Sequence, residues 1–182
     1  MKALGLAGIA VMLTLSLTSF APEPEYAFAM PTAIAERLQP LPYVIPPQYE
    51  WWVRDACERT GVPVWMATRL FSTESAGDPL SGRWNPRAVS WMGAQGLAQV
   101  MPVNIPLFSM LYFGGQPFDP FNPQQAIWAG VNYLADLHAS TGSWRIAVLA
   151  YNGGLAHYLN PRKYGDWADE SVSYVRRVMG AE

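Results

Sequence analysis

The segment that decides the fold comprises residues 63–75, with the sequence PVWMATRLFSTES. Its first residue is a proline, which suits the start of a helix because the missing N–H would bond nothing there. When residues are placed about 100° apart, three apolar side chains and one acid share a face of the predicted helix: Ala67, Leu70, Phe71 and Glu74. A carboxyl group therefore projects from the stripe that the fold is expected to bury.

Two circumstances predict a raised pKa for Glu74. Burial disfavours the ionised form, and the last turn of a helix carries the negative end of the helix dipole. A carboxylic acid that stays protonated near neutral pH can donate a proton to the leaving oxygen of a glycosidic bond. The alternative is an ordinary glutamate at a frayed helix end that turns into solvent, before the Gly-Asp-Pro of residues 77–79.

The rest of the chain predicts further helices and almost no strand. Apolar spacing and capping residues predict helices over residues 48–59, 94–101, 122–139, 143–153 and 169–179. Residues 81–93 and 104–121 lack these patterns and predict irregular segments. The fold class is therefore all-α, with at most a small β-hairpin, in a single domain.

The helix over residues 122–139 carries the clearest signals. Asn122 suits the N-cap and Pro123 the first helical position. Five residues are predicted to face the core: Ile127, Gly130, Val131, Leu134 and Leu137.

The first 29 residues predict an export signal. Lys2 gives a short positive region, residues 3–17 form an uncharged apolar run, and Ala27-Phe28-Ala29 offers a cleavage site after Ala29. The alternative is an uncleaved membrane anchor, since the apolar run extended to Phe20 approaches the roughly 18 residues of a spanning helix. Either way, the body of the protein is expected outside the cytoplasm, in the periplasm or cell envelope. The prolines of residues 30–47 predict an extended leader before the domain.

Composition excludes several classes of function. The net charge is −2 and charged residues make up 14% of the chain, which argues against a nucleic-acid partner. Cys57 is the single cysteine, so it is expected to be a buried apolar group and no intrachain disulfide can form. The two histidines, His138 and His157, fit no metal-binding motif, and neither a nucleophile motif nor a phosphate loop occurs. We therefore expect neither metal nor cofactor.

Downstream of Glu74-Ser75 the chain carries four motifs in order: NPRAVS at 85–90, GAQGLAQVMP at 93–102, AYNGG at 150–154 and ESVSYV at 170–175. In this order and spacing they resemble the catalytic domain of the soluble lytic transglycosylases, over roughly residues 48–180. The resemblance implies a lysozyme-like domain, here spanning residues 48–182. It also implies a substrate, the glycan strands of peptidoglycan, cut between N-acetylmuramic acid and N-acetylglucosamine without consuming water.

The resemblance also gives the motif residues expected roles. Glu74 would protonate the leaving oxygen and then, as a carboxylate, deprotonate the C6 hydroxyl of the muramic acid, which gives a 1,6-anhydro product. Five residues would contact the sugar or orient the acid: Ser75, Gln99, Tyr151, Asn152 and Tyr174. Gly96 and Gly153 would permit tight turns and the close approach of a ligand. Without the resemblance, Gln99 reads as a helix cap, Asn152 as a turn residue and both tyrosines as core.

Two features depart from the family pattern. Residues 76–84 lengthen the loop beside the acid, and Ala98 stands where the family commonly has methionine. Three further aromatic residues are candidates either for stacking on sugars or for the core: Trp84, Trp91 and Tyr112.

Two rival functions remain open at this point. A hydrolytic lysozyme would need a second carboxylate roughly 5 to 9.5 Å from Glu74, with Asp78, Asp119 and Asp136 as candidates. A non-catalytic glycan-binding protein could serve an envelope-spanning secretion, conjugation or phage assembly.

Overall fold

The computed structural model describes residues 40–159 and 169–180. The predicted export signal or anchor over residues 1–29 and most of the leader lie outside this part. The described elements are η1 (Pro47–Tyr49), α1 (Glu50–Thr60), α2 (Val64–Ala76), η2 (Pro102–Asn104), α3 (Ile105–Phe113), α4 (Pro123–Thr141), α5 (Trp144–Gly153), α6 (Leu155–Leu159) and α8 (Asp169–Met179). No helix within these ranges is long and apolar enough to cross a membrane.

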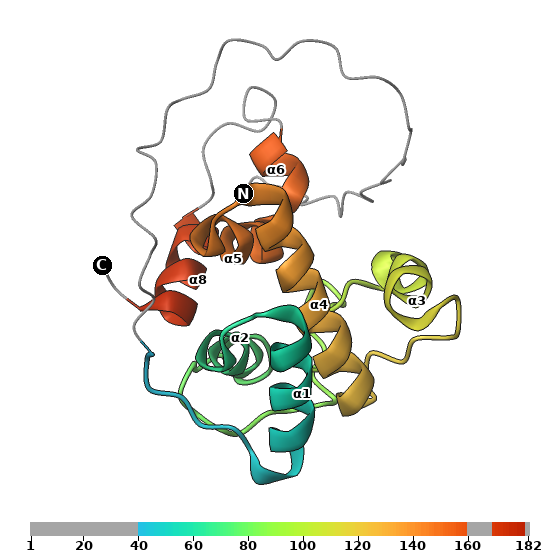
Figure 1. Cartoon of the computed structure of the whole chain (residues 1–182), viewed down its shortest axis with the longest axis horizontal. Helices are drawn as coiled ribbons and strands as arrows, with labels where there is room; N and C mark the ends of the chain where they lie inside the picture. Colours follow the sequence, from blue (N-terminus) through green and yellow to red (C-terminus); the bar gives the residue numbers. More distant parts are fainter. Residues whose placement is uncertain (1–39, 160–168, 181–182) are drawn as a thin grey trace.

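Helix α4 forms the spine of the domain. It packs against both α1 and α5, while α8 packs against both α5 and α2 (Figure 1). The predicted N-cap is confirmed, because Oδ1 of Asn122 accepts the backbone N–H groups of Gln124 and Gln125 at 3.0 and 3.2 Å. The five residues predicted to face the core are all buried.

A glycine on α4 allows α2 to approach closely. A Cβ atom at Gly130 would lie 2.8 Å from the ring of Phe71 and 3.1 Å from the Cβ of Ala98. Both distances are shorter than ordinary van der Waals contact, so the core admits no side chain at this position. The small residue at Ala98, one of the two departures noted in the sequence, therefore lies against α4.

The predicted helix over residues 94–101 is wrong. These residues form a tight turn, with single antiparallel bridges between Val89 and Gln95 and between Gln95 and Val100. The physical reason lies partly in Gly96, whose φ is 73° and where a Cβ atom would lie 1.8 Å from the carbonyl oxygen of Pro120. Gln99 also has a positive φ of 48°, which a right-handed helix excludes. The turn therefore takes the place of the small hairpin that the sequence allowed.

The prediction that residues 104–121 are irregular is also wrong in part. Helix α3 occupies the first half of this segment, with Pro106 in its first turn, and η2 precedes it. Pro106 is compatible with this helix, because a proline in the first turn removes no helical hydrogen bond. A short helix, α6, follows Gly154 and was not predicted. In contrast, α8 has the predicted bounds and α2 agrees with its prediction to within one residue.

One buried arginine joins the beginning of the described chain to its end. Nε of Arg69 donates to the carbonyl oxygen of Val178 at 2.7 Å, Nη2 to that of Arg177 at 2.5 Å, and Nη1 to that of Pro42 at 3.1 Å. A Cβ atom at Gly180 would lie 3.1 Å from Leu41, so the chain enters and leaves the domain side by side. The bonds to Val178 and Arg177 satisfy carbonyl groups that the last turn of α8 leaves without helical partners.

Candidate active site

Glu74 lies in the last turn of α2 and meets a side chain from the other end of the sequence. The hydroxyl of Tyr174, on α8, donates to Oε1 of Glu74 at 2.5 Å. Tyr174 is buried, whereas Glu74 keeps partial exposure. The hydroxyl of Tyr174 thus holds one oxygen of the carboxyl group in place.

Burial raises the pKa of Glu74 from its ordinary value of 4.5 to about 7. The hydrogen bond from Tyr174 and the positive charge of Arg177 act in the opposite direction, because both favour the carboxylate. The raised pKa predicted from the apolar stripe is therefore confirmed. The alternative, a glutamate that turns freely into solvent, does not agree with this environment.

Tyr151, near the end of α5, interacts electrostatically with the acid. Its hydroxyl donates to the carbonyl oxygen of Ala98 at 3.0 Å, which connects α5 to the turn over residues 95–100. Burial, and after it the negative charge of Glu74, raise the pKa of Tyr151 well above the ordinary value. The same two causes lead for Tyr174. Both tyrosines therefore remain protonated near neutral pH and act as hydrogen-bond donors.

Asn152 follows Tyr151 and is exposed. Oγ of Ser171 donates to its Oδ1 at 2.8 Å, so α8 fixes the orientation of the amide. Sequence reasoning missed Ser171, although it lies in the ESVSYV motif, because a serine in a helix gives no signal by itself. A tight turn was expected at Gly153, but Gly153 is the last residue of α5. The positive φ, 88°, belongs to the next residue, Gly154.

Ser75 and Gln99 make hydrogen bonds that shape the backbone around the acid. Oγ of Ser75 donates to the carbonyl oxygen of Phe71 at 2.8 Å and accepts the N–H of Asn85 at 3.3 Å, which ties the Asn-Pro motif to α2. Nε2 of Gln99 donates to the carbonyl oxygens of Gly96 at 2.8 Å and Ala88 at 3.4 Å. The Gln99 side chain therefore closes the turn to which it belongs. This local role is close to the helix cap that was the alternative to sugar binding for this residue.

The three aromatic candidates lie in different environments. Trp84 belongs to the core, because it is buried, stacks on Tyr49 and donates its indole N–H to Oγ of Ser72 at 2.7 Å. Tyr112 is half-buried and donates to Asp136 at 2.8 Å. Trp91, in contrast, is 90% exposed.

The three carboxylates considered for a second catalytic group are all exposed. Asp78 accepts the N–H of Leu80, Asp119 accepts that of Phe121, and Asp136 accepts the hydroxyl of Tyr112. Within residues 40–159 and 169–180, none of them is among the causes that shift the pKa of Glu74. In that same part of the chain, no group of three or more His, Cys, Asp or Glu side chains could hold a metal ion.

Comparison with known proteins identifies the family of this domain. A family model described as the Transglycosylase SLT domain matches residues 53–173. The transglycosylase of Enterobacteria phage PRD1 is 26% identical over 132 residues, which cover 71% of this chain and 42% of the phage protein. Membrane-bound lytic murein transglycosylase C of Actinobacillus succinogenes is 29% identical over 144 residues, which cover 72% of this chain and 38% of that protein. The chain thus spans less than half the length of these relatives.

Solved structures confirm the predicted all-α, lysozyme-like fold. An inactive mutant of the lytic transglycosylase Slt from Pseudomonas aeruginosa superposes with a TM-score of 0.60 and 23% identity, over 74% of this chain and 23% of that one. The soluble lytic transglycosylase SLT70 of Escherichia coli gives a TM-score of 0.58 and 22% identity, over 71% of this chain and 22% of that one. Because the family model covers well over half of the sequence, the chain belongs to the Transglycosylase SLT domain family.

Proposed function

We propose that this protein is a peptidoglycan lytic transglycosylase in which Glu74 acts first as general acid and then as general base. The observation that carries the proposal is a glutamate with a pKa of about 7 that is held by the hydroxyl of Tyr174 at 2.5 Å. Near neutral pH, such a carboxyl group is present in both forms. It can therefore release a proton and take one back within a single catalytic cycle.

The reaction begins when Glu74 transfers its proton to the oxygen between N-acetylmuramic acid and N-acetylglucosamine. The bond from this oxygen to C1 of the muramic acid breaks, and positive charge develops on the sugar ring. The Glu74 carboxylate next takes the proton of the C6 hydroxyl, whose oxygen bonds to C1. A 1,6-anhydro ring results, no water is consumed, and Glu74 is protonated again.

The neighbours of Glu74 support both halves of this cycle. Burial keeps a large share of Glu74 protonated near neutral pH, while Tyr174 and Arg177 stabilise the carboxylate that forms. Exposed Asn152 is suited to bind sugar hydroxyl or acetamido groups, with Ser171 fixing its amide. Gln99, Ser75 and Tyr151 contribute by holding the walls of the site, with Gln99 partly exposed toward a ligand.

A hydrolytic mechanism has less support. It requires a second carboxylate to activate water or to attack the sugar. Among the described residues, no carboxylate other than Glu74 itself enters the electrostatic surroundings of the acid. The relatives are named transglycosylases, and the Slt of Pseudomonas aeruginosa is described as an inactive glutamate-to-glutamine mutant. These names favour one essential glutamate and a non-hydrolytic product.

Product analysis on purified peptidoglycan tests the proposal. We expect the wild type to release fragments with 1,6-anhydro ends, which mass spectrometry detects as one water lighter than hydrolysed ends. Glu74→Gln should lower the rate by about 10²- to 10⁴-fold or more, the contribution of general acid catalysis. Glu58→Gln, an exposed glutamate on α1, is the matched control and should keep full activity. Hydrolysed ends, or unchanged activity of Glu74→Gln, would overturn the mechanism.

We place this reaction in the cell envelope, outside the cytoplasm. The export signal predicted over residues 1–29 supports this location, and the related transglycosylase C proteins are named membrane-bound. As a second context for the same chemistry, we propose local cutting of the wall for an envelope-spanning or phage assembly. Similarity to the transglycosylase of phage PRD1 supports that context.

A further inference from the structure

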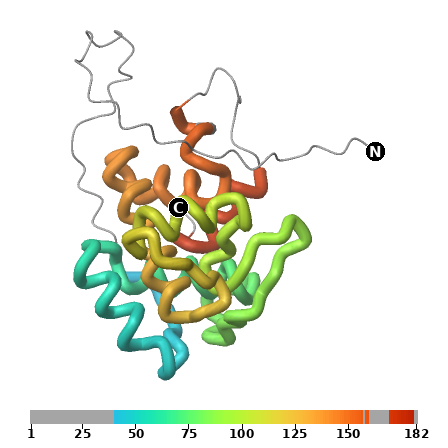
Figure 2. Tube along the Cα trace, turned by 90° about the vertical axis from the view of Figure 1, so that its right-hand side faces the viewer, coloured from blue at the N-terminus to red at the C-terminus, as the bar shows by residue number. Residues whose placement is uncertain are grey.

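A hollow lies apart from Glu74, between α1, the end of α3 and the start of α4. Its volume is about 300 Å³, and seven residues line it: Trp52, Asp55, Phe113, Asn122, Gln124, Gln125 and Trp128. None of these residues belongs to α2, α5 or α8, the helices that hold Glu74 and its partners. Figure 1 shows α3 and the start of α4 at the opposite end of the domain from α5 and α8. In Figure 2, α1 and the loop that follows Glu74 lie on opposite sides of the trace.

The three aromatic rings of this hollow are already held in place. Trp52 stacks on Tyr49, with ring centroids 6.0 Å apart, and Phe113 stacks on Phe118 at 5.2 Å. The indole N–H of Trp128 donates to the carbonyl oxygen of Tyr112 at 3.3 Å. Rings that are fixed before binding lose little conformational entropy when a ligand covers them. They form a suitable platform for the apolar face of a flat ligand.

The polar side chains of the hollow are equally ordered. Oδ1 of Asn122 accepts two backbone N–H groups of α4, and Oε1 of Gln125 accepts the N–H of Asp119 at 2.8 Å. With their carbonyl oxygens engaged, these two amides have their N–H₂ ends to offer as donors. Asp55 and Gln124 add acceptors.

Donors and acceptors together with aromatic rings suit a sugar, which carries hydroxyl groups at its edge and C–H groups on its faces. Charge narrows the choice, because the lining contains Asp55 and no lysine or arginine. Asp55 forms an ion pair at 2.9 Å with Arg59, a residue that does not line the hollow. A carboxylate on the ligand would still be repelled by the negative charge of Asp55. The ligand should therefore be neutral. An acetamido group would add a carbonyl acceptor for the amides and a methyl group for the rings.

We propose that this hollow is a second saccharide site, which binds one neutral N-acetylglucosamine unit of a glycan strand in preference to free N-acetylmuramic acid, whose lactyl group is a carboxylate. The volume is at the small end of ligand pockets, about 300 to 1,000 Å³, so it suits one ring rather than an oligosaccharide. This assignment rests on the proposed function for the identity of the polymer. A strand held here keeps the enzyme on the wall between cuts, because a second weak contact raises the local concentration of the catalytic site.

Binding measured without cleavage tests the site. In full-length Glu74→Gln protein, we expect Trp52→Ala to weaken binding to purified peptidoglycan about tenfold, by co-sedimentation. Trp51→Ala is the matched control, since Trp51 is the adjacent residue, is 75% exposed and does not line the hollow. Gln124→Ala, at an exposed position, provides a second variant that leaves the core intact and should weaken binding about threefold. Equal binding by all three variants would overturn the site.

Titration with single sugars tests the specificity. Followed by NMR of the indole N–H groups, N-acetylglucosamine should shift the signals of Trp52 and Trp128 at lower concentration than N-acetylmuramic acid does. Asp55→Asn should make the concentrations that the two sugars require more similar. If they stay as different as in the wild type, Asp55 does not cause the selectivity. These readouts do not depend on cleavage. If Glu74→Gln still cuts the wall while Trp52→Ala binds it poorly, the proposed mechanism fails and the second site stands. If Glu74→Gln does not cut the wall while Trp52→Ala binds it normally, the mechanism stands and the second site fails.

Discussion

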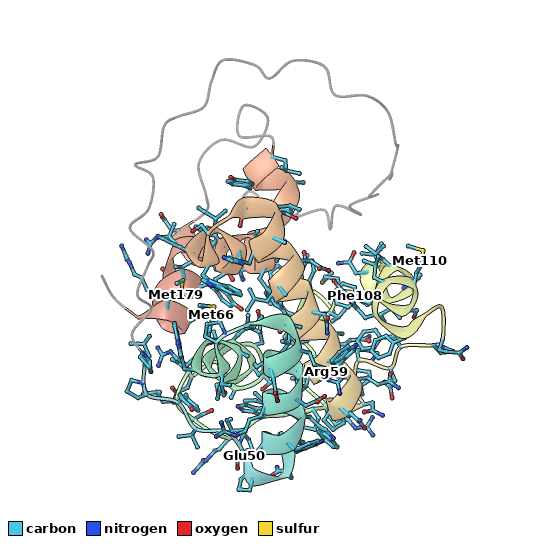
Figure 3. The ribbon with its side chains drawn as sticks, viewed as in Figure 1. Glu50, Arg59, Met66, Phe108, Met110 and Met179 are labelled. Carbon is cyan, nitrogen blue, oxygen red and sulfur yellow. The ribbon has the colours of Figure 1, made fainter. Side chains whose placement is uncertain are left out.

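Helices α2 and α3 make an instructive pair, because the more polar one is buried and the more apolar one lies at the surface. Ten of the thirteen residues of α2 are buried, among them an arginine, two serines and two threonines. In α3, which contains no charged residue, only Phe108 is buried, while Met110 and Leu111 are 61% and 47% exposed. Figure 3 shows the same contrast between Met66, close to α2 and α8, and Met110, on the outside of α3.

The difference lies in what the neighbours offer. Each buried polar group of α2 has a partner. Arg69 bonds three carbonyl oxygens and Ser72 accepts from Trp84. Thr68, Thr73 and Ser75 bond carbonyl oxygens of their own helix. Among the described residues, no buried side-chain nitrogen or oxygen lacks a hydrogen bond. Burial of polar groups is tolerated when such bonds are complete. Helix α3 has a single deep anchor and touches mainly α4 and η2.

The largest expected effect comes from paired methionine substitutions in the two helices. Met66, on α2, is fully buried, so Met66→Ser should lower the free energy of unfolding by about 4 kcal/mol or more, through loss of apolar contacts and burial of a hydroxyl. Met110→Ser, on α3, should change it by less than about 0.5 kcal/mol. Urea unfolding measures both. A comparable loss in the two variants would mean that α3 is covered in solution.

Arg69 should come next. Arg69→Met removes the donor to three carbonyl oxygens and should cost about 3 kcal/mol, because buried acceptors lose their partners. The matched control is Arg59→Met on α1, whose arginine forms an exposed pair with Asp55 and should matter by about 0.5 kcal/mol or less. Thermal unfolding of the two variants decides whether the buried arginine has this role. Equal melting temperatures would contradict it.

Glu74→Gln should stabilise the fold, in a way that depends on pH. The folded state raises the pKa of Glu74 from 4.5 to about 7, so it binds the proton more tightly than the unfolded state does. Wild-type stability is therefore intact below pH 4.5 and decreases as the pH rises through 7. The glutamine variant does not titrate, and its advantage should grow from near zero at pH 4.5 to as much as about 3 kcal/mol above pH 7. A constant difference across this range would mean that burial does not raise the pKa.

The smallest predicted change is a shift in a pH profile. Tyr174→Phe removes a hydrogen bond that favours the carboxylate, so the pKa of Glu74 should rise. The first step needs protonated Glu74, and the alkaline limit of kcat/KM should move to higher pH. Tyr151→Phe is the control, because its hydroxyl donates to the carbonyl oxygen of Ala98 and should move the limit less. A purely structural role for Tyr174 would lower the rate without moving the limit.

The sequence predicted those parts of the fold that depend on local pattern. Helices α2, α4 and α8 were found because apolar spacing, Asn122 and flanking glycines are read within one segment. Glu74 was found as an acid in an apolar stripe. The turn at residues 95–100 was missed because its cause is distant: the carbonyl oxygen of Pro120 leaves no room beside Gly96.

The active site itself depended on contacts that no local pattern contains. The bond from Tyr174 to Glu74 joins residues a hundred positions apart, and only the resemblance to lytic transglycosylases brought them together beforehand. The roles of Arg69 and Ser171 were missed for the same reason. The local signal for Arg69 was a charged residue in a helix expected to be buried, and it is hard to interpret until the three carbonyl partners are known.

The clamp that Arg69 forms between Pro42 and the end of α8 also has an architectural consequence. Because residues 41 and 180 are neighbours, a longer polypeptide can lead into this domain and resume from nearly the same point. Domains with adjacent ends are readily inserted into other proteins. A domain with this geometry could be inserted into another protein without long connecting segments.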